Sequence, residues 1–281
     1  MKARMRLLAW PYAGWMAVFI VIPLTLVLVY GITSGDIHDV STWRLTFDNF
    51  SRFGEPIYLK VMGDSFLLAV ASTLLCLLLG YPVAMIIARS DPRHRNLLLM
   101  LFLVPMWMNF LLRTYAWMSL LSPNGLINRL LESIGLPRLA IMPGPWAVLL
   151  GMVYNFLPFM VLPIYTSLSK VDRGLLEAAA DLGADRMRTF WKVIFPLSIP
   201  GVVSGITMVF MPAVSTFVIS SLLGGSKTLL IGDVIEQQFT YDRNWHFGSS
   251  LSIILMVLIL LSMALMSRID RSRPAEEGGK A

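Results

Sequence analysis

The sequence predicts an all-α polytopic membrane protein with six transmembrane helices. Its 281 residues are 56% hydrophobic and only 14% charged, whereas a soluble domain carries about 25% charged residues. Six apolar runs are each long enough for the hydrocarbon core of a bilayer, which takes about 20 residues. The basic residues lie at the ends of these runs. This length leaves no room for a separate soluble domain, so we expect a single transmembrane domain over residues 1–281.

The first run follows a basic N-terminus that carries Lys2, Arg4 and Arg6. A signal peptide has an apolar core of only about 7–15 residues, so this longer run is expected to be an uncleaved first span. The six expected spans cover residues 7–32, 65–88, 97–121, 146–168, 198–222 and 249–267.

The basic residues predict the orientation of the chain. Six spans place both termini on one side of the membrane. That side holds 15 of the 23 lysines and arginines, the opposite side holds seven, and Arg113 lies within the third run. Because basic residues are enriched in cytoplasmic loops, we expect both termini in the cytoplasm. The net charge of +6 therefore follows topology, and no isolated basic patch indicates nucleic acid.

The outer loops contain no convincing metal site. The set Asp36, His38, Asp39 and Asp48 matches no standard ligand spacing, which favours a solvated loop. Two short helices are expected in the later outer loops, at residues 128–134 and 229–239. The single cysteine, Cys76, lies inside an apolar run and is interpreted as a small core residue.

The sequence shows no catalytic set. The three histidines, His38, His94 and His246, lie in loops without a nucleophile or further ligands nearby. No GxxxxGK[ST] phosphate-binding loop is present. We therefore expect neither an enzyme nor a nucleotide site on this chain.

The longest charged segment between two apolar runs covers residues 170–196 and is called the elbow below. Two apolar sets in it follow helical spacing, residues 175, 178, 179 and 182 and then residues 187, 190, 191 and 194. Asp172 and Asp185 are placed to cap two helices, and Gly183 permits a turn between them. The pattern predicts a helix–glycine–helix unit that docks into a groove on another protein. The alternative is an ordinary amphipathic loop that clamps two spans together.

The elbow resembles the EAA loop of permease subunits of ATP-binding-cassette importers. Five positions fall in register with that pattern: Glu177, Ala178, Ala179, Gly183 and Pro196. Val193 and Phe195 stand where the pattern has Ile and Leu. The resemblance implies a type I importer permease in a bacterial inner membrane and makes these five residues the contact with an ATPase. It also implies three kinds of partner: a second permease, two ATPase subunits that hold ATP and Mg²⁺, and an extracytoplasmic binding protein. This chain would bind no cofactor itself.

Further motifs are similar to the spermidine/putrescine permease branch. They are Gly80-Tyr81-Pro82, Val104-Pro105, residues 112–117, Leu223-Gly224-Gly225 and Ile231-Gly232-Asp233. Thr216 and Ser221 are neutral where some members carry an acidic residue. The resemblance implies import of polyamines. Other readings are the same machine with an opine, amino acid, phosphonate or ferric ion as substrate, a stand-alone carrier or channel, and a membrane assembly factor.

Five residues are candidates for the substrate pathway: Asp64, Tyr115, Trp117, Asp233 and Glu236. The outer loops hold nine acidic against seven basic residues, which suits a cationic substrate. Asp233 and Glu236 share one face if their segment is helical, and an aromatic wall can hold an organic cation. The alternative is that both acids are solvated or pair with Arg243 or a partner subunit.

Overall fold

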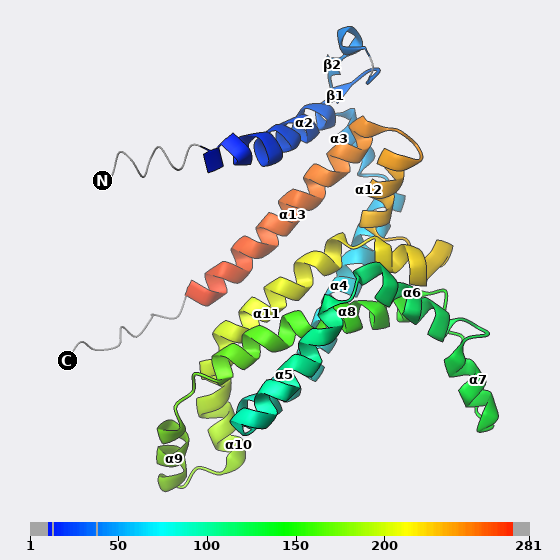
Figure 1. Cartoon of the computed structure of the whole chain (residues 1–281). Helices are drawn as coiled ribbons and strands as arrows, with labels where there is room; N and C mark the ends of the chain where they lie inside the picture. The colour runs from blue at the N-terminus through cyan, green and yellow to red at the C-terminus, as the bar shows by residue number, and fades with distance from the viewer. Residues whose placement is uncertain (1–10, 13, 38, 272–281) are drawn as a thin grey trace, which may run out of the picture. The chain divides into compact units, whose positions relative to one another are not determined.

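The computed structural model describes residues 11–12, 14–37 and 39–271. The chain divides into two compact units: unit 1 combines residues 1–61 with 232–260, and unit 2 combines residues 62–231 with 261–281 (Figure 1). The basic N-terminus, the start of the first expected span, His38 and the charged tail after residue 271 lie outside the described residues.

Unit 1 is built on two long helices and a small hairpin. A π-helical turn, η1 (Ala17–Val21), leads into α2 (Ile22–Gly31). Strands β1 (Thr33–Ser34) and β2 (Arg44–Leu45) pair antiparallel around a 3₁₀ turn, η2 (Val40–Thr42). The short α3 (Asp48–Arg52) precedes α4 (Pro56–Arg89), of which only the first turns belong to unit 1. The later chain returns as α12 (Ile231–Thr240) and the first part of α13 (Trp245–Arg271).

The core of unit 1 centres on the start of α13. Phe247 is fully buried, with the Tyr58 ring edge-on at 5.0 Å and the Arg52 guanidinium 4.4 Å above its centre. A Cβ on Gly31 would lie 2.4 Å from Ile253 Cδ1, so α2 and α13 approach closely only because this residue is glycine. Residues 33–64, between the first two expected spans, are therefore partly folded, and their last part is the start of α4.

Unit 2 is organised around the contact between α8 (Pro145–Leu168) and α11 (Phe195–Ser215). Small residues allow the close approach: a Cβ on Gly201 would lie 2.5 Å from Pro163 O, and one on Gly205 would lie 2.8 Å from Met160 Sδ. Close packing through small residues is typical of membrane helices, since hydrophobic burial does not drive helix association in lipid. Helix α4 also packs against α8, because Gly80 allows α4 to lie close to Met160 and Val161.

The third expected span, residues 97–121, is not one continuous helix. It consists of α5 (Pro92–Trp107) and α6 (Phe110–Leu121), and the chain bends by 91° between Pro92–Trp107 and Phe110–Ser133. Met108 and Asn109 are not helical, and Asn109 Oδ1 accepts a hydrogen bond from Leu111 N at 2.8 Å. This capping interaction starts a new helix, so the uniform hydropathy of the run concealed a break.

The fifth expected span also has different bounds. Helix α11 ends at Ser215, where Thr216 becomes extended, and a separate π-helical turn, η4 (Ser220–Gly224), and a 3₁₀ turn, η5 (Gly225–Lys227), follow. At its other end α11 continues directly from the elbow, so that Arg186–Ser215 forms one helical stretch of 30 residues. Pro196 lies inside this stretch, shortly after a π-helical turn over Phe190–Ile194, where the regular α-helical hydrogen-bond pattern is already altered.

The helices confirm the all-α polytopic class. Within the described part of the chain, five helices are long and apolar enough to cross a membrane, and the bent pair α5–α6 makes six if it counts as one span. Strands in the same part are limited to β1 and β2. Both expected loop helices are present, as α7 (Leu126–Ser133) and α12.

Candidate functional site

The elbow folds as two short helices joined by a glycine turn. Helix α9 (Arg173–Asp181) begins where Asp172 Oδ1 accepts a hydrogen bond from Gly174 N at 2.9 Å. Helix α10 (Arg186–Thr189) begins where Asp185 Oδ1 accepts one from Arg188 N at 2.7 Å. Both helices lie together at one end of α11 (Figure 1). The two carboxylates therefore act as the caps that the sequence predicts.

Gly183 adopts a left-handed conformation, with φ of +76°. It closes α9 in a Schellman motif, in which Gly183 N donates to Ala180 O at 2.9 Å and Ala184 N donates to Ala179 O at 3.0 Å. No heavy atom lies within 4 Å of the position that a Cβ would occupy. A side chain here would strain the backbone and project into open space, where a docked protein would meet it.

The elbow exposes large apolar side chains. Leu182 is 89% exposed, Met187 66% and Trp191 56%. Ile194, at the far end of the second apolar set, is buried against the rest of unit 2. Exposed apolar side chains on a helical element indicate an interaction surface, so the elbow has one end anchored in its own chain and one end open.

Glu177 lies on α9 beside a basic cavity. It is the fifth residue of that helix and so lies beyond the first turn. The helix dipole favours an acidic residue only within the first turn. A cavity of about 410 Å³ is lined by Glu177, Arg89 at the end of α4 and Arg95 at the start of α5. Ala178 and Ala179 follow Glu177 on the same helix. Ala179 is partly covered, whereas Glu177 and Ala178 are exposed.

The elbow joins α11 through a π-helical turn, η3 (Phe190–Ile194). The Phe190 ring contacts those of Trp191 and Phe195, with centroids 5.1 Å and 6.1 Å apart. Pro196 follows at the start of α11. The last residue of the family pattern is therefore part of a continuous helix, not the end of a loop.

The candidate pathway residues fall in both units. Asp64 lies on α4, exposed, instead of in a loop, and Tyr115 and Trp117 lie on α6, all in unit 2. The Trp117 ring meets that of Tyr154 edge-on at 5.2 Å, while Tyr115 is exposed. Residues two apart on a helix face different directions, so these two aromatic rings do not form one wall.

Asp233 and Glu236 lie on α12 in unit 1 and are three residues apart, as the sequence predicts. Asp233 is only 7% exposed, and Glu236 is partly covered. The burial of Asp233 excludes the reading that this carboxylate is simply solvated.

Asp36, Asp39 and Asp48 do not converge on a metal site. Asp39 instead caps η2, and hydrogen bonds from the side chain and backbone of Ser41 lower the pKa of its carboxyl group. Asp48 accepts a hydrogen bond from Thr46 Oγ1 at 2.8 Å. Among the described residues, no three His, Cys, Asp or Glu side chains are close enough to hold a metal ion.

Two functional candidates escaped the sequence reasoning. Tyr81 and Ser198 share a hydrogen bond of 2.9 Å between their hydroxyl groups, although they are 117 residues apart. An apolar cavity of about 590 Å³ is lined by Trp117, Tyr154, Trp146 and Leu75. The Gly80-Tyr81-Pro82 motif was the one signal for the first. For the second, the sequence indicated only Trp117, as a candidate wall of the substrate pathway, and not the cavity that it lines.

The elbow lies within a segment that matches a known protein family. The model of the family described as binding-protein-dependent transport system inner membrane component matches residues 80–273, which include the whole elbow. The chain belongs to this family. It is 41% identical over 260 residues to the spermidine/putrescine transport system permease protein PotB of Salmonella typhimurium (strain SL1344), which covers 92% of this chain and 91% of that protein. It is 38% identical over 260 residues to PotB of Haemophilus influenzae, with the same two coverages.

Solved structures of transporters share the fold. A bacterial ABC transporter involved in the import of the acidic polysaccharide alginate matches with a TM-score of 0.82 and 15% identity, over 98% of this chain and 97% of that chain. The MetNI methionine ABC transporter, in inward-facing conformations, matches with a TM-score of 0.58 and 18% identity, over 78% of this chain and 98% of that chain. The predicted importer-permease fold is confirmed, and the chain is a multi-pass inner-membrane permease of this family.

Proposed function

We propose that this permease forms half of the translocation pathway of an ATP-driven importer for polyamines. A second permease would supply the other half, two ATPase subunits would bind the elbows, and an extracytoplasmic binding protein would deliver the substrate. The observation that supports this most is the elbow, which matches the family pattern and exposes Leu182, Met187 and Trp191 around an open glycine turn. The names of the PotB relatives support polyamines as the substrate class.

The elbow is proposed to face the cytoplasm, together with both termini. The 15 to seven distribution of lysines and arginines supports this orientation. Single cysteines introduced into a Cys76→Ala background would be labelled with a membrane-impermeant reagent in intact cells. Labelling of a cysteine at Met187 from outside would overturn both the orientation and the contact with an ATPase.

ATP with Mg²⁺ would bind to the partner ATPases and drive their closure. This chain's part would be mechanical: α9 and α10 receive the displacement and pass it to α11, with which α10 is continuous. ATP can shift the permease between inward- and outward-open states only through contacts that differ between the two states. A stand-alone carrier or channel needs no such contact, so purification of the chain with an ATPase distinguishes the two functions.

The substrate cation is proposed to meet Asp233 and Glu236, with Asp64 and an aromatic ring of Tyr115 or Trp117 assisting. A charge-assisted hydrogen bond contributes about 1.5–3 kcal/mol, and each 1.4 kcal/mol is about tenfold in affinity. Asp233→Asn together with Glu236→Gln should therefore weaken the apparent affinity for polyamines about tenfold or more.

Uptake of labelled spermidine and putrescine by the complete transporter tests this site. Asp48→Asn is the matched control, since it removes an acid of the same outer region that bonds locally to Thr46. Unchanged uptake in the double variant would remove Asp233 and Glu236 from the site. Uptake of a labelled opine, amino acid, phosphonate or ferric ion by a transporter that takes up no polyamine would replace the substrate class and leave the importer itself intact.

A further inference from the structure

The π-helical turn η3 changes which side chains share a face between the elbow and α11. In an α-helix, residues five apart point about 140° away from each other, because each residue turns about 100°. A π turn closes its hydrogen bonds between residues five apart. Phe190 and Phe195 accordingly have ring centroids only 6.1 Å apart. This turn therefore presents two rings together at the junction.

Both rings contact one residue of another helix. Tyr81, on α4, meets Phe190 edge-on at 5.8 Å and Phe195 at 6.0 Å. Its hydroxyl lies 2.9 Å from Ser198 Oγ, in the first turns of α11. Tyr81 is almost fully covered and Ser198 is fully buried. One side chain of α4 thus contacts three residues along the junction between the elbow and α11: Phe190, Phe195 and Ser198.

The direction of this hydrogen bond follows from the donors available. Ser198 Oγ donates to Phe195 O at 2.8 Å within its own helix. A serine hydroxyl has only one hydrogen to donate, so Tyr81 donates and Ser198 accepts. Ser198 would remain satisfied without Tyr81. The bond is therefore not needed to satisfy a buried group of α11, and its effect is to fix the position of one helix against the other.

The anchor of Tyr81 is itself closely packed. The preceding residue, Gly80, lies where a Cβ would be 3.2 Å from Met160 and 3.3 Å from Val161 of α8. Helix α8 is in turn packed against α11 at Gly201 and Gly205. The Tyr81 contact closes a triangle of three helices, α4, α8 and α11, at the end where α10 enters α11.

We infer that Tyr81 is a positioning residue that makes α4 follow the elbow. When the ATPase displaces α10, the ring and hydroxyl contacts of Tyr81 carry α4 along with α11, and the two helices move as one body. The inference rests on the proposed coupling function of the elbow. Without the hydroxyl, the elbow would move while α4 lags, so ATP would be hydrolysed with less substrate transported per ATP.

The test uses the complete transporter in proteoliposomes, with labelled spermidine as substrate, and measures transport and ATP hydrolysis separately. Tyr81→Phe keeps the ring and removes only the hydroxyl. We expect at least a threefold fall in substrate transported per ATP, with the ATPase rate within twofold of the wild type. Ser72→Ala is the matched control: it removes another buried hydroxyl of α4, one that bonds to Ala69 O of its own helix, and should leave the ratio unchanged.

Ser198→Ala and the double variant Tyr81→Phe/Ser198→Ala complete a double-mutant cycle. Because the two hydroxyls act through one bond, the double variant should be no worse than either single variant. An unchanged ratio in Tyr81→Phe, a proportional fall of transport and hydrolysis, or additive losses would each overturn the inference. If the wild-type complex itself shows no ATP-dependent uptake, the proposed function fails instead.

A distance measurement gives a readout that does not depend on transport. Spin labels on cysteines at Ile86 of α4 and Leu197 at the start of α11, both exposed and both outside the proposed docking surface of the elbow, would be placed in a Cys76→Ala background. In the wild type the distance between them should stay the same in nucleotide-free and ATP-trapped states. In Tyr81→Phe it should change or broaden between states. A wild-type distance that already changes would show that α4 and α11 do not move together.

Discussion

The elbow and the loop around α7 have the same local design but are held in different ways. Helices α9 and α7 both end in a Schellman motif: Gly135 N donates to Glu132 O at 3.1 Å and Leu136 N to Leu131 O at 2.8 Å, as their counterparts do at Gly183. Both glycines have φ of +76°, and neither has a heavy atom within 4 Å of an added Cβ. Both helices also expose leucines, Leu130 on α7 and Leu175 on α9.

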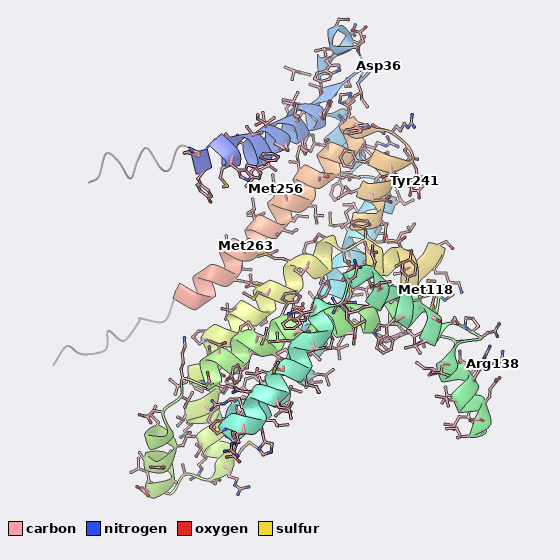
Figure 2. The ribbon with its side chains drawn as sticks, in the orientation of Figure 1. Asp36, Met118, Arg138, Tyr241, Met256 and Met263 are labelled. Carbon is pink, nitrogen blue, oxygen red and sulfur yellow. The ribbon has the colours of Figure 1, made fainter. Side chains whose placement is uncertain are left out.

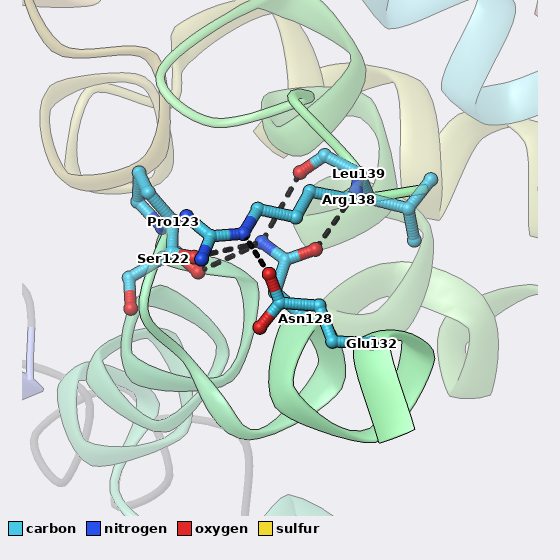
Figure 3. A network of polar contacts seen from close by, with 6 residues as sticks. All are labelled: Ser122, Pro123, Asn128, Glu132, Arg138 and Leu139. Atoms are coloured by element: carbon cyan, nitrogen blue, oxygen red, sulfur yellow. Dashed lines mark hydrogen bonds and ion pairs between the residues drawn. The ribbon is translucent and has the colours of Figure 1, made fainter. Parts of the chain in front are cut away.

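The difference lies in what fixes each segment. Asn128 of α7 is 2% exposed and donates to Ser122 O, Pro123 O and Leu139 O, while its Oδ1 accepts from Leu139 N at 2.7 Å (Figure 3). Arg138, in the chain that returns from α7 (Figure 2), pairs with Glu132.

Among the described residues, the elbow helices α9 and α10 have no comparable buried polar network. The elbow's described side chains form no ion pair with one another, and their hydrogen bonds to the backbone of the two elbow helices are the two caps. A buried polar network gives a segment one defined position, and α7 carries its own. Equal backbone geometry therefore does not imply equal roles: the α7 loop is held by contacts of its own, whereas the elbow presents an exposed apolar surface.

The largest expected effect comes from placing the same residue at both glycines. Aspartate at φ of +76° costs about 1–2 kcal/mol at either site, because the left-handed conformation is unfavourable for a residue with a Cβ. Gly183→Asp should lower substrate uptake at least tenfold while the protein remains in the membrane, since its side chain would project into the surface proposed to dock the ATPase. Gly135→Asp should keep uptake within about twofold.

Uptake and membrane content would be measured side by side for the two variants. Equal losses of uptake would show that backbone strain, and not the surface of the elbow, is responsible. Normal uptake in Gly183→Asp would show that the elbow is only a connecting loop.

The second effect concerns the network that fixes α7. Asn128→Ala should leave the Leu139 N–H group without its partner, which costs about 1–3 kcal/mol. The amide of Leu139 should therefore exchange hydrogen about five to 150 times faster. Asn124→Ala, which removes an exposed asparagine of the same loop, is the control and should change nothing. Unaltered exchange at Leu139 in Asn128→Ala would mean that the loop is held by its apolar contacts.

Local chemistry made the elbow predictable from sequence. Asp172, Asp185 and Gly183 act through hydrogen bonds and backbone angles within five residues, so their caps and the turn could be foreseen and are confirmed. The long apolar runs likewise predict the helices. Hydropathy averages over a window, however, so it missed the break at Asn109, which depends on one side chain and two backbone angles.

Contacts between distant residues could not be foreseen. The Tyr81–Ser198 bond joins residues 117 positions apart and depends on a π turn that no pattern marks. The burial of Asp233 likewise depends on the packing around α12, which a single sequence does not determine. Periodicity identifies a face of a helix, but it does not identify what covers that face.

A smaller effect is expected from the caps of the elbow. Asp185→Ala removes the acceptor for Arg188 N and should destabilise α10 by about 1 kcal/mol, so the Arg188 amide should exchange about fivefold faster. Asp181→Ala is the control, because an acid at the end of α9 opposes the helix dipole and its loss should not weaken the helix. The effect should shrink when the ATPase is bound. A difference that is the same with and without the ATPase would argue against docking at α10.

The smallest effect should come from the ion pair beside the network. Arg138 and Glu132 are both about half exposed, and an exposed pair of this kind contributes about 0–1 kcal/mol. Arg138→Gln should therefore leave the exchange of the Leu139 amide within about twofold at physiological salt, although Arg138 directly precedes Leu139 in the sequence. Exchange as fast as in Asn128→Ala would assign the fixing of α7 to charge. In that case the protection of the Leu139 amide in the wild type should weaken as salt is raised, because salt screens exposed ion pairs. If the Leu139 amide of Arg138→Gln exchanges slowly at every salt concentration, the buried side chain of Asn128 is the group that fixes the α7 loop. The elbow has no equivalent of it among its described residues.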